Sequence, residues 1–150
     1  MTEPQVKPKS NAEILLSQDP CVTALGFRID DHTPGALVLS LTVGRQHLNF
    51  NGVAHGGVLF TLADTAFGCS ANALGQVSIG IDTHMTFNAP AREGDVVTAR
   101  ATEVTRSSRL ATYRVDLTRQ DGRPIGCFTG TVFLPGQRQD LLPDDPPVIP

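Results

Sequence analysis

The spacing of hydrophobic and polar residues changes twice along this chain. Between residues 36 and 43, leucines alternate with other side chains, which places the leucines on one face of an extended strand. Between residues 57 and 74, apolar residues recur at helical spacing and cover more than one stripe. Alternation returns at residues 79–88. The pattern therefore predicts strands, then one long helix that is apolar nearly all round, then further strands.

Turn residues divide the remaining chain into short segments. Thr33-Pro34-Gly35 and Asp121-Gly122 predict tight turns between neighbouring strands, and Gly75 predicts the C-terminal cap of the long helix. The expected strands are residues 26–32, 36–43, 79–88, 96–105, 110–119 and 124–134.

These elements predict an α+β protein in which one antiparallel sheet wraps around a long central helix, with the last four strands in a meander. Residues 1–20 are expected to form an N-terminal extension, disordered at first and then a short helix that ends at Asp19-Pro20. Residues 21–135 form the domain, and residues 136–150 form a mobile tail. Such a sheet leaves edges and helix surface uncovered, so pairing of subunits is expected.

Composition narrows the class of protein. A chain of 150 residues is one domain, and its formal net charge of −3 argues against nucleic acid or a membrane surface as the main partner. No apolar run is long enough to span a membrane and no signal sequence is present, which predicts a cytoplasmic protein. Cys21, Cys69 and Cys127 lack metal-ligand spacing and are interpreted as free thiols.

The long helix carries one carboxylate, Asp64, among apolar residues, and a polar, glycine-rich loop precedes it. Burial disfavours an ionised carboxylate and raises its pKa, which moves the group toward useful basicity. Gly56 and Gly57 open the helix, where backbone N–H groups form a natural anion site. Together they predict a base or nucleophile and a donor for a developing oxyanion.

The motif Asn49-x-x-Gly52-x-x-His55-Gly56-Gly57, followed by Leu62-Ala63-Asp64-Thr65-Ala66, resembles the hotdog-fold acyl-CoA thioesterases, most closely the phenylacetic-acid-degradation (PaaI-type) branch. The resemblance implies hydrolysis of a thioester to a carboxylic acid and free coenzyme A, without a further cofactor. Aryl-acetyl thioesters, such as phenylacetyl- or hydroxyphenylacetyl-CoA, are the implied substrates.

The resemblance also implies roles for single residues. Asp64 corresponds to the catalytic carboxylate and the Gly56 N–H to the donor that polarises the thioester. Asn49 and His55 correspond to residues that orient water, the carboxylate or substrate. Some relatives carry a helper hydroxyl where this chain has Gly68 or Gly80, so Thr65 or Thr83 is the candidate replacement.

Gly56 and Asp64 are eight residues apart, which is about 12 Å along a helix. This distance is too long for both to contact one carbonyl group. We therefore expect an isologous dimer with shared active sites, in which glycines from one subunit face Asp64 of the other. The resemblance further suggests a dimer of dimers, hence a homotetramer.

Basic and hydroxyl residues near strand ends are candidate contacts for coenzyme A phosphates, because guanidinium groups bind phosphate well. These candidate phosphate contacts are Arg92, Arg106, Ser108 and Arg109. Gly57 and Thr65 are the other predicted substrate-binding residues. Phe67, Met85 and Phe87 are candidate acyl contacts.

Three alternatives stay open at this point. A non-catalytic acyl-CoA-binding hotdog module would not need Asp64, and an enoyl-CoA hydratase or dehydratase would use other His and Asp positions. A metal site from His47, His55 and Asp64 lacks a ligand spacing to support it, so no metal is expected. Asp64 either activates water or attacks the thioester to form an anhydride, and the sequence does not decide between these.

Overall fold

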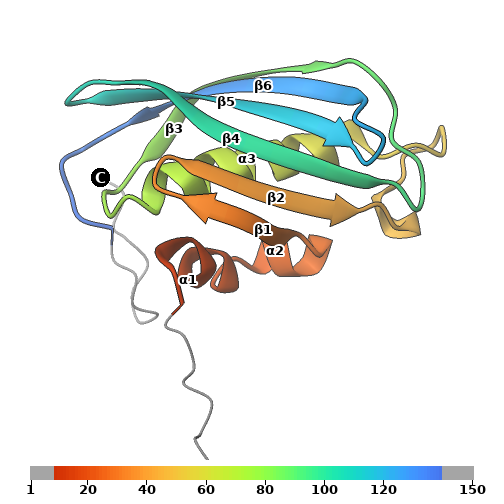
Figure 1. The fold of residues 1–150 in the computed structure, drawn as a ribbon, viewed down its shortest axis with the longest axis horizontal. Helices are drawn as coiled ribbons and strands as arrows, with labels where there is room; N and C mark the ends of the chain where they lie inside the picture. The colour runs from red at the N-terminus through yellow and green to blue at the C-terminus, as the bar shows by residue number, and fades with distance from the viewer. Residues whose placement is uncertain (1–8, 140–150) are drawn as a thin grey trace, which may run out of the picture.

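The computed structural model describes residues 9–139, and the expected disorder before residue 9 and mobility after residue 139 lie outside this part. Its sheet has six antiparallel strands above a long helix (Figure 1). The strands are β1 (Arg28–Thr33), β2 (Ala36–Thr42), β3 (Ile79–Phe87), β4 (Val96–Arg106), β5 (Leu110–Arg119) and β6 (Pro124–Phe133). The helices are α1 (Asn11–Ser17), α2 (Pro20–Leu25), the 3₁₀ helix η1 (Arg45–His47) and α3 (Gly56–Asn72).

The strand order is β1-β2-β4-β5-β6-β3, with antiparallel pairing throughout. The predicted hairpins are confirmed at Gly35 and Gly122, both of which have a positive φ. The predicted four-strand meander is wrong at its first strand, because β3 pairs with β6 at the far edge and not with β4. Residues 88–95 carry the chain back across the end of the sheet to β4. Only β4, β5 and β6 form a meander.

Helix α3 fills the concave face of the sheet and packs against β2, β3, β4, β5 and β6. The alternating leucines of β2 are almost fully buried, as the pattern predicts. The Phe67 ring lies 5.8 Å from the Tyr113 ring and 5.5 Å from that of Phe128, centroid to centroid. A Cβ on Gly130 would lie 2.8 Å from the Phe67 ring, so glycine is required where this ring meets β6. Phe67 is therefore a core residue and not the acyl contact that the sequence suggested.

One face of α3 remains outside this core. Its small and polar residues recur at helical spacing, and Asp64 among them is exposed in the single chain. The members of this open stripe are Thr61, Asp64, Thr65, Gly68 and Asn72. The sheet covers the other faces of the helix only, so this part of the helix surface stays uncovered in the single chain.

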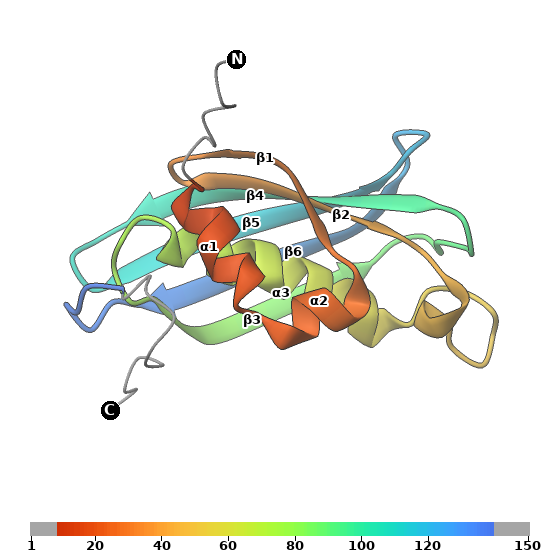
Figure 2. The same ribbon diagram turned by 90° about the horizontal axis from the view of Figure 1, so that it is seen from below.

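Helix α1 packs against α3 on the side away from the sheet, and α2 follows next to α1 (Figure 2). The predicted helix start is confirmed, because Ser10 and Glu13 form a reciprocal capping box. The sequence missed α2, since Asp19 accepts hydrogen bonds from the N–H groups of Cys21 and Val22 and so begins a second helix. Gly26 ends α2 in the left-handed conformation.

The C-terminal end of α3 also differs by a few residues from the prediction. The helix ends at Asn72 with Ala73 as its cap, and Gly75 lies in the turn that follows. Residues 137–139 hydrogen-bond to this turn through Val77 N–H and Gly75 C=O, so the described chain remains structured beyond the expected boundary at residue 135. Within residues 9–139, no helix is both long and apolar enough to cross a membrane.

Candidate active site

Two backbone N–H groups at the N-terminus of α3, those of Gly56 and Gly57, differ in whether a hydrogen bond within the described chain already uses them. His55 is the N-cap, and its Nδ1 accepts a hydrogen bond of 2.8 Å from the Gly57 N–H. A Cβ on Gly57 would lie 3.1 Å from this nitrogen, so the cap needs a glycine there. The Gly56 N–H has no acceptor among the described residues. Of the two predicted glycine donors, Gly56 alone can therefore offer its N–H to a substrate oxygen.

The loop before α3 is a rigid turn built by Asn49. Its side-chain oxygen accepts hydrogen bonds from Asn51 N–H at 2.8 Å and Val53 N–H at 3.4 Å, and its backbone groups bond to Gly52 and Val53. This use of the oxygen leaves the Asn49 side-chain NH₂ as the group that could reach a substrate. The turn also holds Phe50 almost entirely in solvent, at 97% exposure.

An open cavity of about 380 Å³ lies beside the first turn of α3. Gly56 and Leu59 form its helical side, and Phe87 with residues 88–90 forms the opposite side. The Phe87 ring is 53% exposed and lies 3.4 Å from the point that a Cβ on Gly56 would occupy. The predicted acyl contact Phe87 therefore lies next to the predicted oxyanion donor.

Asp64 lies at a second open cavity, of about 330 Å³, between α3 and α1. Thr65 and Gly68 of the open stripe line the same cavity, and Leu15 and Leu16 of α1 form its far wall. The carboxylate has no hydrogen bond or ion pair within the described residues, and partial burial alone raises its pKa. An unpartnered carboxylate with a raised pKa is suited to accept a proton or attack a carbonyl carbon.

Gly56 and Asp64 thus line different cavities in the single chain. The structure brings Gly56 together with His55 and Phe87, and it brings Asp64 together with Thr65. Thr83, the other candidate helper hydroxyl, lies on the exposed strand β3.

The candidate phosphate contacts fall at two ends of the molecule. Arg92 follows Ala91, whose carbonyl accepts from the Ala54 N–H, so Arg92 lies near the start of α3. Arg106, Ser108 and Arg109 lie at the β4–β5 turn, at the opposite end of α3 (Figure 1).

Arg106 is already paired within its own chain. Its guanidinium contacts the Glu103 carboxylate at 2.9–3.1 Å and donates to the Tyr113 hydroxyl at 3.2 Å. The pairing with Arg106 lowers the pKa of Glu103, and burial raises the pKa of Tyr113 to about 12. Within residues 9–139, neither Arg92 nor Arg109 forms an ion pair, so Arg109 is the stronger phosphate candidate at this turn.

His47 has a structural position that the sequence did not indicate. Its ring is 2% exposed, Nδ1 accepts from the Gly44 N–H at 2.9 Å, and Nε2 lies 2.9 Å from the Leu25 carbonyl oxygen. The ring therefore joins the end of α2 to the loop before α3. In the described part of the chain, no three His, Cys, Asp or Glu residues gather as a metal site would require.

Two residues that the sequence reasoning missed are Leu15 and Leu16. In the sequence they are two apolar residues of a short predicted helix. They line the Asp64 cavity because α1 packs on α3. The hydrophobic spacing of α1 predicts a packed face but does not show what that face covers.

In the part of the chain that the structure describes, a sheet curls around one helix that has a free N–H at its start and an unpartnered carboxylate two turns later. This arrangement is typical of a site for acyl transfer. Comparison with known proteins gives the class directly. The thioesterase superfamily profile matches residues 51–125. The chain belongs to this superfamily, has its hotdog fold, and is a thioester hydrolase.

Individual relatives agree with this assignment. The chain is 32% identical to acyl-coenzyme A thioesterase PaaI of Escherichia coli over 120 residues, covering 80% of this chain and 86% of that protein. The structure of E. coli PaaI superimposes with a TM-score of 0.83 at 31% identity, covering 85% and 93% of the two chains. The structure of a hypothetical thioesterase of Streptococcus pneumoniae with coenzyme A gives a TM-score of 0.74 at 30% identity, covering 78% of this chain and 92% of that chain.

Proposed function

We propose that this protein hydrolyses acyl-CoA thioesters, with Asp64 as general base or nucleophile and the Gly56 N–H as the oxyanion donor. One observation carries the proposal: within residues 9–139, α3 presents an N–H without an acceptor at its first turn and a carboxylate without a partner on its open stripe. Both groups belong to a chain of the thioesterase superfamily, and the related hypothetical thioesterase of S. pneumoniae was crystallised with coenzyme A.

The chemistry follows from these two groups. The substrate carbonyl oxygen accepts from the Gly56 N–H, which polarises the carbon–oxygen bond. Asp64 takes a proton from water as the water oxygen bonds to the carbonyl carbon. Collapse of the tetrahedral oxyanion breaks the carbon–sulfur bond, and the proton on Asp64 passes to the leaving thiolate. In the nucleophilic variant, the Asp64 oxygen attacks first and water then hydrolyses the anhydride.

A dimer supplies both groups to one substrate. Strand β3 is a sheet edge, and its Ile81 and Phe87 are 58% and 53% exposed. An exposed apolar edge is a template for pairing with another strand. Pairing of two β3 edges across a twofold axis sets the two α3 helices antiparallel, with open stripes of small residues facing each other. Gly56 of one subunit then approaches Asp64 of the other, and a dimer of dimers completes the proposed tetramer.

An aryl-acetyl thioester is the proposed substrate, because the chain is similar to E. coli PaaI, a protein from the phenylacetic acid degradation operon, and because the aromatic Phe87 lies beside Gly56. The test is release of free thiol from a panel of phenylacetyl-, hydroxyphenylacetyl-, benzoyl- and linear acyl-CoA. We expect the highest kcat/KM with the aryl-acetyl members. Binding without thiol release on every member would favour a non-catalytic module. Loss of enoyl absorbance without thiol release, when an enoyl-CoA is added to the panel, would favour a hydratase.

The role of Asp64 can be resolved by a single turnover in water labelled with heavy oxygen. An anhydride intermediate hydrolysed at the enzyme carbonyl leaves the label in Asp64, which mass spectrometry of the peptide detects. Direct attack by water places the label in the product acid only.

The pH profile provides a further prediction. Asp64 acts as a carboxylate, and partial burial raises its pKa. We therefore expect kcat/KM, which reports groups of the free enzyme, to fall on the acid side at a pH above the ordinary aspartate range. A carboxylate with a raised pKa becomes protonated at a higher pH than an ordinary aspartate. A stopped assay with a pH-independent thiol readout measures this. An acid limb at or below the ordinary range would contradict the role of Asp64.

Contacts to coenzyme A give a matched pair of variants at the β4–β5 turn. Arg109→Ala is expected to raise KM by about tenfold with little change in kcat, since one charge-assisted hydrogen bond is lost. The control Arg106→Ala breaks the Glu103 ion pair instead, so it should lower the melting midpoint and change KM less. A KM for Arg109→Ala equal to that of wild type would place the phosphates elsewhere.

A further inference from the structure

Strand β3 forms an outer edge of the sheet and, among the described strands, pairs with β6 alone (Figure 2). Ile81 and Phe87 of this strand are 58% and 53% exposed. They lie three positions before and three positions after His84, so the exposed apolar residues of β3 are symmetric about one histidine. An edge strand with exposed apolar side chains is a template for pairing with another strand.

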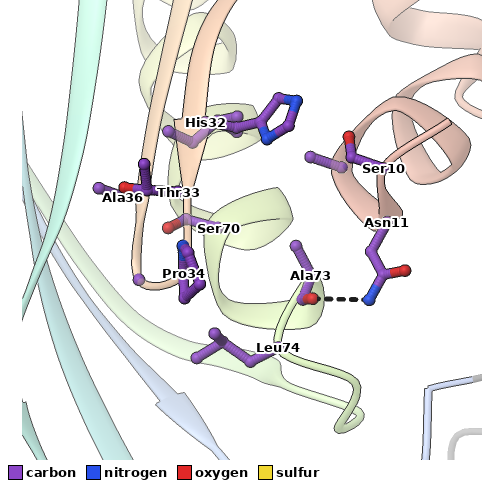
Figure 3. Close-up of a pocket in the computed structure, with 12 residues that line it drawn as sticks. Ser10, Asn11, His32, Thr33, Pro34, Ala36, Ser70, Ala73 and Leu74 are labelled. Carbon is purple, nitrogen blue, oxygen red and sulfur yellow. Dashed lines mark hydrogen bonds between the residues drawn. The ribbon is translucent and has the colours of Figure 1, made fainter. Parts of the chain in front are cut away.

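Helix α1 is held toward the other edge of the sheet. The side-chain NH₂ of Asn11 donates to the Ala73 carbonyl at 2.9 Å and fixes the start of α1 against the C-terminal end of α3 (Figure 3). The β1–β2 hairpin lies beside this point, and β1 and β3 are opposite edges of the sheet. Most side chains of β3 are exposed, so this edge is open to a second copy of the chain.

The proposed shared site fixes the level at which a twofold axis crosses α3. This step rests on the proposed function, because it takes Gly56 of one subunit and Asp64 of the other to act on one substrate. A twofold axis perpendicular to two antiparallel helices relates equal distances on either side of it. Gly56 then lies level with Asp64 of the partner subunit only if the axis passes midway between the two positions, at Phe60.

Two contacts relate levels on α3 to levels on β3. A Cβ on Gly56 would lie 3.4 Å from the Phe87 ring. A Cβ on Gly80 would lie 3.3 Å from the Phe67 ring. The strand therefore runs antiparallel to the helix, and between these contacts eleven residue steps of α3 lie beside seven steps of β3. The level of the axis falls at His84, the same residue about which the exposed apolar side chains are symmetric.

We propose that β3 pairs with β3 of a second copy of this chain, antiparallel and in the register centred on His84. In this register Ile81 of the partner subunit lies directly opposite Phe87, where cross-strand apolar and aromatic side chains pack together. Phe87 lines the Gly56 cavity. Ile81 of the partner subunit therefore completes the wall of that cavity and limits the size of the acyl group.

The charges along β3 agree with this register. Asp82 lies opposite Thr86 of the partner subunit and not opposite a second carboxylate. A register centred on Asp82 would oppose two like charges, which destabilises a strand pair. The register centred on His84 thus pairs the apolar residues of the edge and keeps its carboxylates apart.

Disulfide cross-linking tests the register on the full chain and needs no turnover. Cys21 and Cys127 are first replaced by Ser because they are not buried, whereas Cys69 is buried and stays. A residue on the axis faces its own copy with Cα atoms about 4.5 or 5.5 Å apart, which a disulfide can span. We therefore expect His84→Cys to form a covalent dimer on mild oxidation.

Asp82→Cys and Thr86→Cys are the matched controls, two residues to either side on the same strand. Each lies about 13 Å along the strand from its own copy, which is too far for a disulfide. Neither should link alone, but the two refolded together should give a covalent heterodimer. Absence of a link in His84→Cys or in the mixture, or self-linking of either control, would overturn the register.

Substrate selectivity tests the contribution of Ile81 to the cavity. Ile81→Ala should lower the ratio of kcat/KM for phenylacetyl-CoA to that for acetyl-CoA by about tenfold, because apolar contact with the larger acyl group is lost. Weaker dimerisation alone would lower both values alike. Val104→Ala, which truncates a 63% exposed residue of β4, is the control and should keep the ratio.

An unchanged ratio in Ile81→Ala would overturn the contribution of Ile81. Absence of thiol release from the wild type would instead refute the proposed hydrolysis, and the cross-links would still decide the register.

Discussion

Replacing Asp64 by Asn is expected to lower kcat by about 10²–10⁴-fold, the usual range for loss of a general base. The amide has nearly the same size as the carboxylate but cannot accept the proton of water or attack as a nucleophile. KM should change little, because Asp64 makes its contribution as the tetrahedral state forms. Steady-state thiol release with the preferred acyl-CoA measures both constants. Turnover within a few-fold of wild type would remove Asp64 from the mechanism.

The melting midpoint of Asp64→Asn distinguishes loss of catalysis from misfolding of the variant. Burial raises the pKa of Asp64 in the folded state, so protonation of the group favours folding. This contribution is fully present below the unfolded pKa and is lost as the pH rises through the folded pKa. The uncharged Asn avoids that loss, so the melting midpoint of Asp64→Asn at neutral pH should equal or exceed that of wild type. A lower midpoint would indicate a structural role instead.

Gly56→Pro is expected to lower kcat by about 10²–10³-fold, because it removes one oxyanion donor. Gly56 is the first residue of α3, where proline is tolerated since its N–H has no helical acceptor. The preceding residue, His55, already has the extended backbone that proline favours, with φ −61° and ψ 133°. The substitution therefore removes the N–H with little disturbance of the helix.

Gly56→Ala is the matched control, because it adds one carbon atom and keeps the N–H. The new Cβ would lie 3.4 Å from the Phe87 ring, which is an ordinary contact. We expect the alanine variant to retain most of the wild-type kcat. Equal losses in the two variants would mean that space at Gly56 matters and its N–H does not.

The fold was largely predictable because its main signals are local. Strong alternation marks β2, helical spacing marks α3, and glycine turns mark the hairpins. The position of β3 was not predictable in this way. Strand β3 pairs with β6 because residues 88–95 cross the end of the sheet before β4 begins. No local sequence pattern predicts this crossing. The helix α2 was missed because Asp19-Pro20 ends one helix and also starts the next.

The sequence predicted which residues form the candidate site but not how these residues are arranged in space. The motif identified Gly56 and Asp64, and the helix rise alone showed that one chain keeps them apart. The structure adds that the Gly57 N–H is occupied by His55 and that Asp64 is exposed in a single chain. Neither fact follows from spacing, because each depends on side-chain orientation or on which face the sheet leaves open.

The shared site is tested most directly by mixing the two inactive variants. Gly56→Pro and Asp64→Asn are unfolded together, refolded at equal amounts and assayed for thiol release. If one subunit supplies Gly56 and the other supplies Asp64, each mixed dimer contains one intact site, and random pairing restores about one quarter of wild-type activity. If each site belongs to one chain, every site in the mixture carries a defect, and activity that stays at the level of the separate variants would contradict the account.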